Sequence, residues 1–108
     1  MNRGDIVIVS VSGDYGKPRP AVVIQSDRVP ETDSVLVCLV TTQQRETPLY
    51  RLPILPTSVN GLREPSEIMI DKVAGLRRSK CSPPIGRLTP EQIAALNDAL
   101  FFVIGLAD

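Results

Sequence analysis

The sequence predicts a mostly β protein, a small and strongly curved β-barrel followed by one C-terminal α-helix. Three observations lead to this prediction. Short apolar runs rich in Val and Ile are bounded by Gly, Pro or Asp, which is typical of β-strands. The 10 prolines are scattered along the chain and break these runs into short pieces. Only the last segment changes to the three- and four-residue apolar spacing of an amphipathic helix.

Five strands are expected. In chain order they are Ile6–Val11, Ala21–Ile24, Val35–Val40, Arg51–Leu55 and Ile68–Ile70. The segment Gly13-Asp14-Tyr15-Gly16 is expected to turn the first strand back toward the second. Several runs are apolar at every position rather than at alternate positions. Such strands are covered on both faces, here by the barrel core on one side and by a helix or a partner subunit on the other.

The C-terminal helix has a clear start signal. Thr89 is suited to the N-cap, Pro90 to the first helical position and Gln92 to the capping-box position. An apolar stripe at helical spacing follows, made of Ile93, Leu96, Leu100, Val103 and Ala107. Gly105 is placed to end the helix.

Length and composition narrow the possible functions. A chain of 108 residues is expected to form a single domain, residues 1–108. The 12 basic and 12 acidic residues balance, so a basic surface has to come from local clustering. The absence of histidine excludes His-based acid–base catalysis and most metal chemistry, so neither a metal nor another cofactor is expected. Cys38 and Cys81 are isolated thiols with no CxxC motif, so we expect no zinc site and no structural disulfide.

The expected compartment is the cytoplasm. The longest apolar run is about six residues, too short for a transmembrane helix. The start of the sequence, Met1-Asn2-Arg3-Gly4-Asp5, lacks the apolar core of a signal peptide.

The stretch 16-GKPRPAVVIQSD-27 places a charge where a simple turn would more often use Gly, Asn or Asp. Pro18 and Pro20 restrict the backbone around Arg19, directly before an apolar strand. From the residues alone, one interpretation is an ion pair with Asp14 or Asp27. The other is a rigid guanidinium held ready to bind a phosphate.

Two motifs near the N-terminus, 3-RGDIVIVS-10 and 16-GKPRPAVVIQSD-27, resemble the MazF/PemK family of bacterial toxins. Three later stretches are similar to further parts of the family pattern: 35-VLVCLVTTQ-43, 66-SEIMIDKVAGL-76 and 88-LTPEQIAALNDAL-100. The resemblance covers nearly the whole chain in order, and the first two motifs are its specific part.

The resemblance implies an SH3-like β-barrel that forms a homodimer. It also implies metal-independent cleavage of single-stranded RNA at short sequences, and a cognate antitoxin whose flexible tail blocks the site. The sequence supports the dimer independently. Phe101 and Phe102 are adjacent on one short helix and cannot both face the same core, so one is expected to pack on something else.

The resemblance assigns catalytic roles to Arg19 and Thr41. Arg19 would stabilise charge on the phosphoryl oxygens, because arginine stays protonated and is unsuited to base catalysis. Thr41 matches the position where the family uses a hydroxyl on the scissile phosphate. Thr42 lies beside it, and because neighbouring strand residues point to opposite faces, only one of the two is expected to line the site.

Asp71 matches the acidic position of some relatives and is the candidate general base. The alternative is an ion pair with Lys72 or Arg78. The sequence departs from the family pattern at Met69 and Ala74, where some members carry basic residues. These departures put cleavage rate and RNA contacts in question.

Further residues are assigned to RNA binding. Tyr15 precedes Arg19 in the same loop and is expected to stack on a base. The cluster Arg77-Arg78-Ser79-Lys80 is interpreted either as a solvated loop or as a phosphate track that replaces the missing charge. The complete RNA-binding set is Tyr15, Lys17, Thr42, Arg77, Arg78 and Lys80.

Two other functions compete with the nuclease. CcdB-type toxins share the expected fold and poison DNA gyrase, but they act through a C-terminal tryptophan and this chain has none. A degenerate family member that binds RNA or antitoxin without cutting is the other alternative, motivated by Met69 and Ala74.

Overall fold

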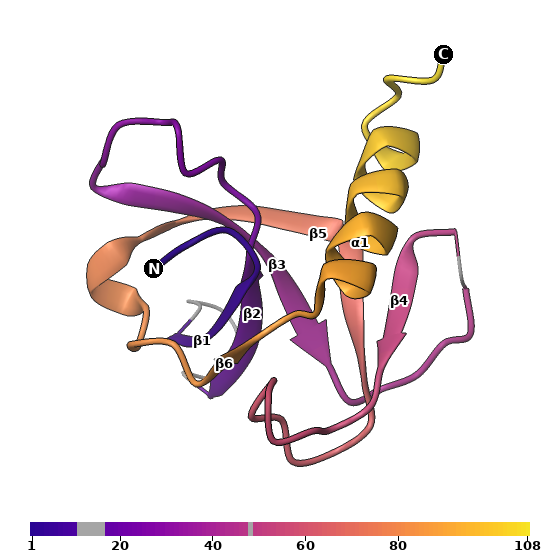
Figure 1. The fold of residues 1–108 in the computed structure, drawn as a ribbon, viewed down its shortest axis with the longest axis horizontal. Coiled ribbons are helices and arrows are strands. Elements are labelled where there is room, and N and C mark those ends of the chain that lie inside the picture. Colours follow the sequence, from indigo (N-terminus) through magenta and orange to yellow (C-terminus); the bar gives the residue numbers. More distant parts are fainter. Residues whose placement is uncertain (11–16, 48) are drawn as a thin grey trace.

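In the part of the chain that the structure describes, a single antiparallel sheet and one α-helix form the fold (Figure 1). The structure, a computed structural model, describes residues 1–10, 17–47 and 49–108. Within these residues the strands are β1 (Asp5–Ser10), β2 (Pro18–Val23), β3 (Ser34–Thr41), β4 (Arg51–Ile54), β5 (Ser66–Arg77) and β6 (Gly86–Arg87). The sheet order is β4-β5-β3-β2-β1-β6. A short 3-10 helix, η1 (Arg78–Lys80), follows β5, and the α-helix α1 (Pro90–Val103) stands beside β5 and β4 in the view of Figure 1.

The curled sheet buries apolar side chains on both of its faces. One cluster packs side chains of the sheet, such as Ile6, Val22 and Cys38, against Leu96 and Ala99 of α1. A second cluster on the opposite face consists of Val7, Val9, Ala21, Val23, Val35 and Val37. Adjacent residues of one strand therefore enter different clusters, which confirms the prediction that the continuously apolar strands are covered on both faces.

The second strand begins earlier than the sequence predicts. Arg19 was expected in a loop before the strand, but it lies within β2 and pairs with Val9 of β1. The ladder between β2 and β3 runs over Ala21–Val23, so Pro18 and Pro20 lie before it begins. Prolines are tolerated at such a place because the ladder on that side needs no N–H from them.

The strand β5 is much longer than the predicted Ile68–Ile70. Its first half pairs with β4 and the end of β3, and its second half pairs with the rest of β3. The β3 register shifts between the two halves: Cys38 pairs with Val73 but Val40 pairs with Ile68. The extra residues of β5 interrupt the ladder at this point, and we call this irregular segment the bulge of β5. Such interruptions are common next to functional sites.

The helix starts as the sequence predicts. The Thr89 hydroxyl accepts a hydrogen bond from the Gln92 backbone N–H, and the Gln92 side chain accepts from the Thr89 N–H, so the capping box is complete. The helix ends at Val103, and Gly105 follows with a φ of 78°. Ala107 lies beyond the helix, so its place in the apolar stripe was wrong.

The outer side of α1 carries both phenylalanines. Phe101 is 50% exposed and Phe102 is 53% exposed, so neither is buried in the core of its own chain. The prediction that the two cannot both face the core is confirmed, and the prediction that one of them packs on another surface stays a prediction. Among the described helices, none is long and apolar enough to span a membrane.

Candidate active site

A basic pocket lies where β2 begins and β3 ends, beside β4 and the bulge of β5. Its volume is about 460 Å³. The described residues that line it are Lys17, Pro18, Arg19, Pro20, Val40, Thr41, Thr42, Gln43, Arg45, Arg51, Met69 and Lys72. Five of them are basic, and none of these described lining residues is acidic. The arrangement suits an anionic ligand.

The sheet register explains why Arg19 and Thr41 meet. Ala21 of β2 pairs with Leu39 of β3, and continuing this antiparallel register by two residues places Arg19 opposite Thr41. Arg19 is half-buried, and Thr41 is the last residue of β3. A guanidinium and a hydroxyl from adjacent strands therefore face one pocket.

Thr42 also lines the pocket, so the expectation that only one of the two threonines could do so was wrong. The strand ends at Thr41, and the alternation of side chains between the two faces ends with it. The Thr41 hydroxyl accepts a hydrogen bond from the Gln43 backbone N–H at 3.1 Å, which helps to turn the chain beyond the strand.

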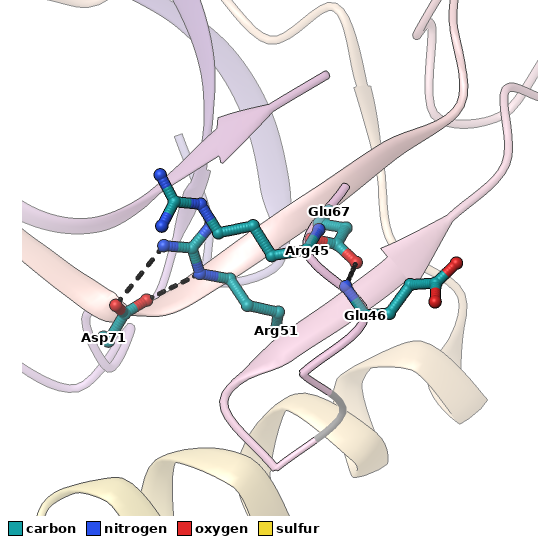
Figure 2. Close-up of polar contacts among 5 residues, drawn as sticks. All are labelled: Arg45, Glu46, Arg51, Glu67 and Asp71. Atoms are coloured by element: carbon teal, nitrogen blue, oxygen red, sulfur yellow. Dashed lines mark hydrogen bonds and ion pairs between the residues drawn. The ribbon is translucent and has the colours of Figure 1, made fainter. Parts of the chain in front are cut away.

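Arg51, at the start of β4, is the most buried cation of the pocket, with 6% of its surface exposed. It donates two hydrogen bonds to Asp71, one from Nε at 3.0 Å and one from an η nitrogen at 3.4 Å (Figure 2). Arg51 pairs with Met69 in the ladder, so Asp71 is its diagonal neighbour two residues along β5. The alternative partners named for Asp71, Lys72 and Arg78, were therefore wrong.

Arg51, the partner of Asp71, also lies next to Met69, the position at which some family members carry a basic residue. Met69 is opposite Arg51 in the ladder, and both side chains line the pocket. A guanidinium therefore reaches this part of the pocket from the neighbouring strand. Ala74, the other departure from the family pattern, packs against the second core cluster.

Arg45 lines the pocket from the loop between β3 and β4. The backbone N–H groups of Arg45 and Glu46 donate hydrogen bonds to the carboxylate of Glu67, at 2.9 and 3.4 Å. In Figure 2 the Arg45 side chain extends from this anchored backbone in the same direction as Arg51.

The remaining predicted RNA-binding residues are not brought to this pocket. Arg77 pairs with Ser34 at the far end of the β3–β5 ladder, while Thr41 pairs with Glu67 at the near end. Arg78 and Lys80 belong to η1, and the Arg78 Nε donates to the Thr32 carbonyl oxygen. Because β3 has 8 residues, its two ends lie about 23 Å apart.

Tyr15, Asp14 and the turn that contains them lie outside the described residues. Asp27, the other partner considered for Arg19, accepts a hydrogen bond from the backbone N–H of Arg3.

Sequence reasoning missed three cations of the pocket, Arg45, Arg51 and Lys72. The sequence did show Arg51 at the start of a predicted strand and the acidic residue Asp71 further along the chain, and these two residues were the available signal for the pair. Their pairing, however, depends on the β4–β5 register, which the sequence does not contain.

An apolar pocket adjoins the basic one. It has a volume of about 580 Å³ and shares Pro20 and Thr42 with the basic pocket as lining residues. Its other described lining residues are Ile8, Gly61, Leu62, Arg63, Glu64, Ser66 and Ile85.

Neither thiol contributes to the basic pocket. Burial raises the pKa of the Cys38 thiol to about 12, and burial also raises the pKa of Cys81. The two cysteines are not joined in a disulfide. Across the described residues, no group of three His, Cys, Asp or Glu side chains is placed to hold a metal ion.

The structure resembles solved toxin structures over nearly its full length. The Mycobacterium tuberculosis toxin MazF-mt6 superposes with a TM-score of 0.80 at 26% identity, covering 94% of this chain and 96% of that one. An endoribonuclease from mycobacterial species, solved in complex with its cognate antitoxin, gives a TM-score of 0.81 at 20% identity, covering 98% and 96%. The second similarity is one of fold.

The sequence comparisons agree with the structural ones. A probable endoribonuclease MazF from Mycolicibacterium smegmatis is 42% identical over 108 residues, covering 99% of each chain. The family model for the PemK-like, MazF-like toxin of type II toxin-antitoxin systems matches residues 2–104. The chain therefore belongs to the PemK-like, MazF-like family of toxins.

Proposed function

We propose that this protein is an endoribonuclease toxin that cuts single-stranded RNA in the basic pocket. The observation that carries the proposal is the meeting of Arg19, Thr41 and Arg51 from three strands in one basic pocket. The similarity to the M. smegmatis relative, a probable endoribonuclease, supports the same activity.

The proposed reaction uses the 2′-hydroxyl of the RNA as its nucleophile. The 2′-oxygen forms a bond to phosphorus, the bond from phosphorus to the 5′-oxygen breaks, and the 2′-hydroxyl proton passes to a base. The 5′-oxygen takes up a proton as it leaves. The products are a 2′,3′-cyclic phosphate and a 5′-hydroxyl. Because RNA supplies the nucleophile, the reaction needs no metal-activated water.

Arg19 is proposed to bind the scissile phosphate with two parallel N–H donors. Its planar guanidinium matches the geometry of phosphate oxygens, and its fixed charge stabilises the transition state. The Thr41 hydroxyl is proposed to donate a further hydrogen bond to the same phosphate. Both prolines beside Arg19 restrict the backbone, so less reorganisation is needed at the transition state.

Asp71 is proposed either as the general base or as the residue that orients Arg51. The orienting role is better supported, because both carboxylate oxygens accept hydrogen bonds from Arg51. A carboxylate engaged in this way is held in one geometry, and Arg51 is then fixed as a second cation near the phosphate.

The apolar pocket is proposed to hold a nucleobase next to the scissile phosphate. It shares the lining residues Pro20 and Thr42 with the basic pocket, so a nucleotide that spans both would place its phosphate among the cations. Lys17, exposed at the edge of the basic pocket, is proposed to contact a neighbouring phosphate.

A homodimer and a protein antitoxin are also proposed. Leu36, Val73, Phe101 and Phe102 are exposed apolar side chains, and such surface favours association. Structures of similar fold were solved as complexes of an endoribonuclease with its cognate antitoxin and of MazE with MazF. A concentration-independent mass of 11.8 kDa by light scattering would contradict the dimer.

The test of the reaction is cleavage of a synthetic RNA in EDTA, with analysis of both new ends. We expect cutting to continue and to leave a cyclic phosphate and a 5′-hydroxyl. An oligonucleotide with 2′-deoxyribose on the 5′ side of the cut should bind without being cut. A 5′-phosphate product would contradict the mechanism. RNA binding with no cutting would favour the non-catalytic alternative, and DNA breaks linked to gyrase with intact RNA would favour the CcdB-like one.

A further inference from the structure

The carboxylate of Glu67 is buried, with 2% of the residue exposed. Burying a carboxylate is unfavourable unless hydrogen bonds compensate for the lost water. Among the described residues, the backbone N–H groups of Arg45 and Glu46 donate hydrogen bonds to Glu67, at 2.9 and 3.4 Å (Figure 2). Both oxygens of the Glu67 side chain therefore bind the backbone of one loop, the β3–β4 loop next to the basic pocket.

The loop that Glu67 binds has an unusual backbone. Glu46 has a φ of 54°, in the left-handed region that residues with a Cβ rarely adopt. A non-glycine residue stays in this region when its surroundings fix it there. The hydrogen bond from the Glu46 N–H to Glu67 is one such constraint, and the bond from Arg45 is its neighbour.

The position of Glu67 connects this loop to the catalytic strands. Glu67 pairs with Thr41 in the β3–β5 ladder and with Pro53 in the β4–β5 ladder. It therefore belongs to the part of the sheet that presents Thr41 and Arg51, and its carboxylate ties the loop to that sheet. Arg45 is exposed at its side chain but anchored at its backbone N–H.

We infer that Glu67 is a positioning residue that holds Arg45 over the pocket, and that Arg45 there binds a phosphate of the RNA strand. This inference rests on the proposed function and adds to it a phosphate contact and the buried group that sets it. Glu67 does not touch the RNA and acts through Arg45.

A double-mutant cycle tests whether Glu67 acts through Arg45. The variants are Arg45→Ala, Glu67→Gln and the double variant. Glutamine has the same shape as glutamate, but its NH₂ group cannot accept from a backbone N–H, so one of the two hydrogen bonds is lost. We expect each single change to lower kcat/KM about tenfold, mainly through KM, and the double variant to be no worse than Arg45→Ala alone. Effects that multiply would show that Glu67 acts independently of Arg45 and would overturn the inference.

The matched control is Glu46→Gln. It makes the same change of charge as Glu67→Gln, on the loop that Glu67 binds, but the Glu46 side chain is exposed and its backbone N–H is kept. We expect its kcat/KM to stay within about twofold of the parent. A loss as large as that of Glu67→Gln would mean that net charge, not the anchored loop, is responsible. Should Glu67→Gln fail to fold, Glu67→Asp withdraws the carboxylate by one methylene, and the same comparison applies.

The salt dependence of binding tests the phosphate contact without relying on cleavage. The probe is an RNA oligonucleotide with one 2′-deoxyribose at the cut. A plot of the logarithm of the binding constant against the logarithm of salt concentration has a negative slope. Removing one phosphate contact on a single strand decreases the magnitude of this slope by about 0.7. We expect this decrease for Arg45→Ala and for Glu67→Gln but not for Glu46→Gln. An unchanged slope for Arg45→Ala would overturn the phosphate contact.

Backbone amide exchange separates this inference from the proposed function. At least one of the N–H groups of Arg45 and Glu46 should exchange at least tenfold faster in Glu67→Gln than in the parent, while amides of α1 stay unchanged. If the protein cut no RNA but showed this faster exchange, the proposed function would be contradicted and the anchoring of the loop by Glu67 would be supported. RNA cleavage with unchanged exchange of both amides would keep the function and overturn the positioning role.

Discussion

Two basic regions of the molecule differ in how they are assembled. The cluster around η1, Arg77, Arg78 and Lys80, is contiguous in sequence and lies at one end of the β3–β5 ladder. The pocket at the other end draws its cations from β2 and the residue before it, the β3–β4 loop, β4 and β5. The first region is visible in the sequence as a charge run, whereas three cations of the second, Arg45, Arg51 and Lys72, join it only after folding.

The difference shows what makes a cation useful for chemistry. In the η1 cluster, the charges follow one another along the chain, and Arg78 is engaged with the Thr32 carbonyl oxygen. In the pocket, Arg51 is buried and held by Asp71, and Arg45 is held through its backbone by Glu67. Fixed cations that converge on one point stabilise a transition state without reorganising, whereas a charge run mainly raises the local potential.

The largest expected effect belongs to Arg19. We expect Arg19→Ala to lower kcat by about 10²–10³, as for removal of one donor from a preorganised anion site. Arg19→Lys should also lose most activity, because an ammonium cannot make the two-pronged contact with phosphate. The measurements are single-turnover cleavage and thermal unfolding, and stability should change by about 1 kcal/mol or less. A fully active alanine variant would remove Arg19 from the catalytic group.

Asp71→Asn decides between the two roles of Asp71. The amide oxygen of the introduced asparagine can still accept a hydrogen bond from the Arg51 Nε, but an amide cannot act as a general base. If Asp71 orients Arg51, as the structure favours, cleavage should fall less than about tenfold. Stability should fall by about 1 kcal/mol, because Arg51 is nearly buried while Asp71 is 33% exposed. A loss of 10³ or more in kcat, with a changed pH profile, would identify Asp71 as the general base.

The η1 cluster should matter least for cleavage. We expect Arg77→Ala and Lys80→Ala each to change kcat/KM on a short RNA by less than about threefold. Both residues lie at the end of the β3–β5 ladder that is far from the pocket. The proposed difference between the two regions would be contradicted if either variant lost more than tenfold in kcat/KM on the short RNA. A loss that appeared only on longer RNA would make the cluster a phosphate track outside the cleavage site.

Cys81 offers a native probe of the same region, because it follows η1 directly. We expect alkylation of Cys81 at pH 8.5 to proceed at the same rate with and without the 2′-deoxy oligonucleotide. Cys38 should stay unmodified, because the pKa of about 12 keeps its thiol neutral until the pH rises far above the assay value. Mass spectrometry of the peptides measures both. Protection of Cys81 by the oligonucleotide would show that RNA reaches the η1 end.

The sequence predicted the kinds of elements well and their limits less well. All five predicted strands exist, and the capping box at Thr89 formed as expected. The length of β5 and the start of β2 were misjudged, since both depend on which neighbour pairs with them. The two-residue strand β6 and the 3-10 helix were not predicted, being too short to have a periodic pattern.

The site divides in the same way. Arg19 and Thr41 were found because short motifs containing them resemble a known family. Arg45, Arg51 and Glu67 were not, because each acquires its role from a register or a loop contact formed with residues 20 or more positions away.

What the sequence determined by itself is local or compositional. It determined which runs become strands, where the helix begins, and that the chemistry has to work without histidine. These properties depend on residues within a few positions of each other, or on composition alone. The tertiary structure decided which cations converge and which carboxylates hold them, because strand register and loop anchoring are fixed by packing between distant segments. Arg51 is a catalytic candidate only when β4 lies beside the bulge of β5, and Arg45 only when Glu67 is buried beneath its loop.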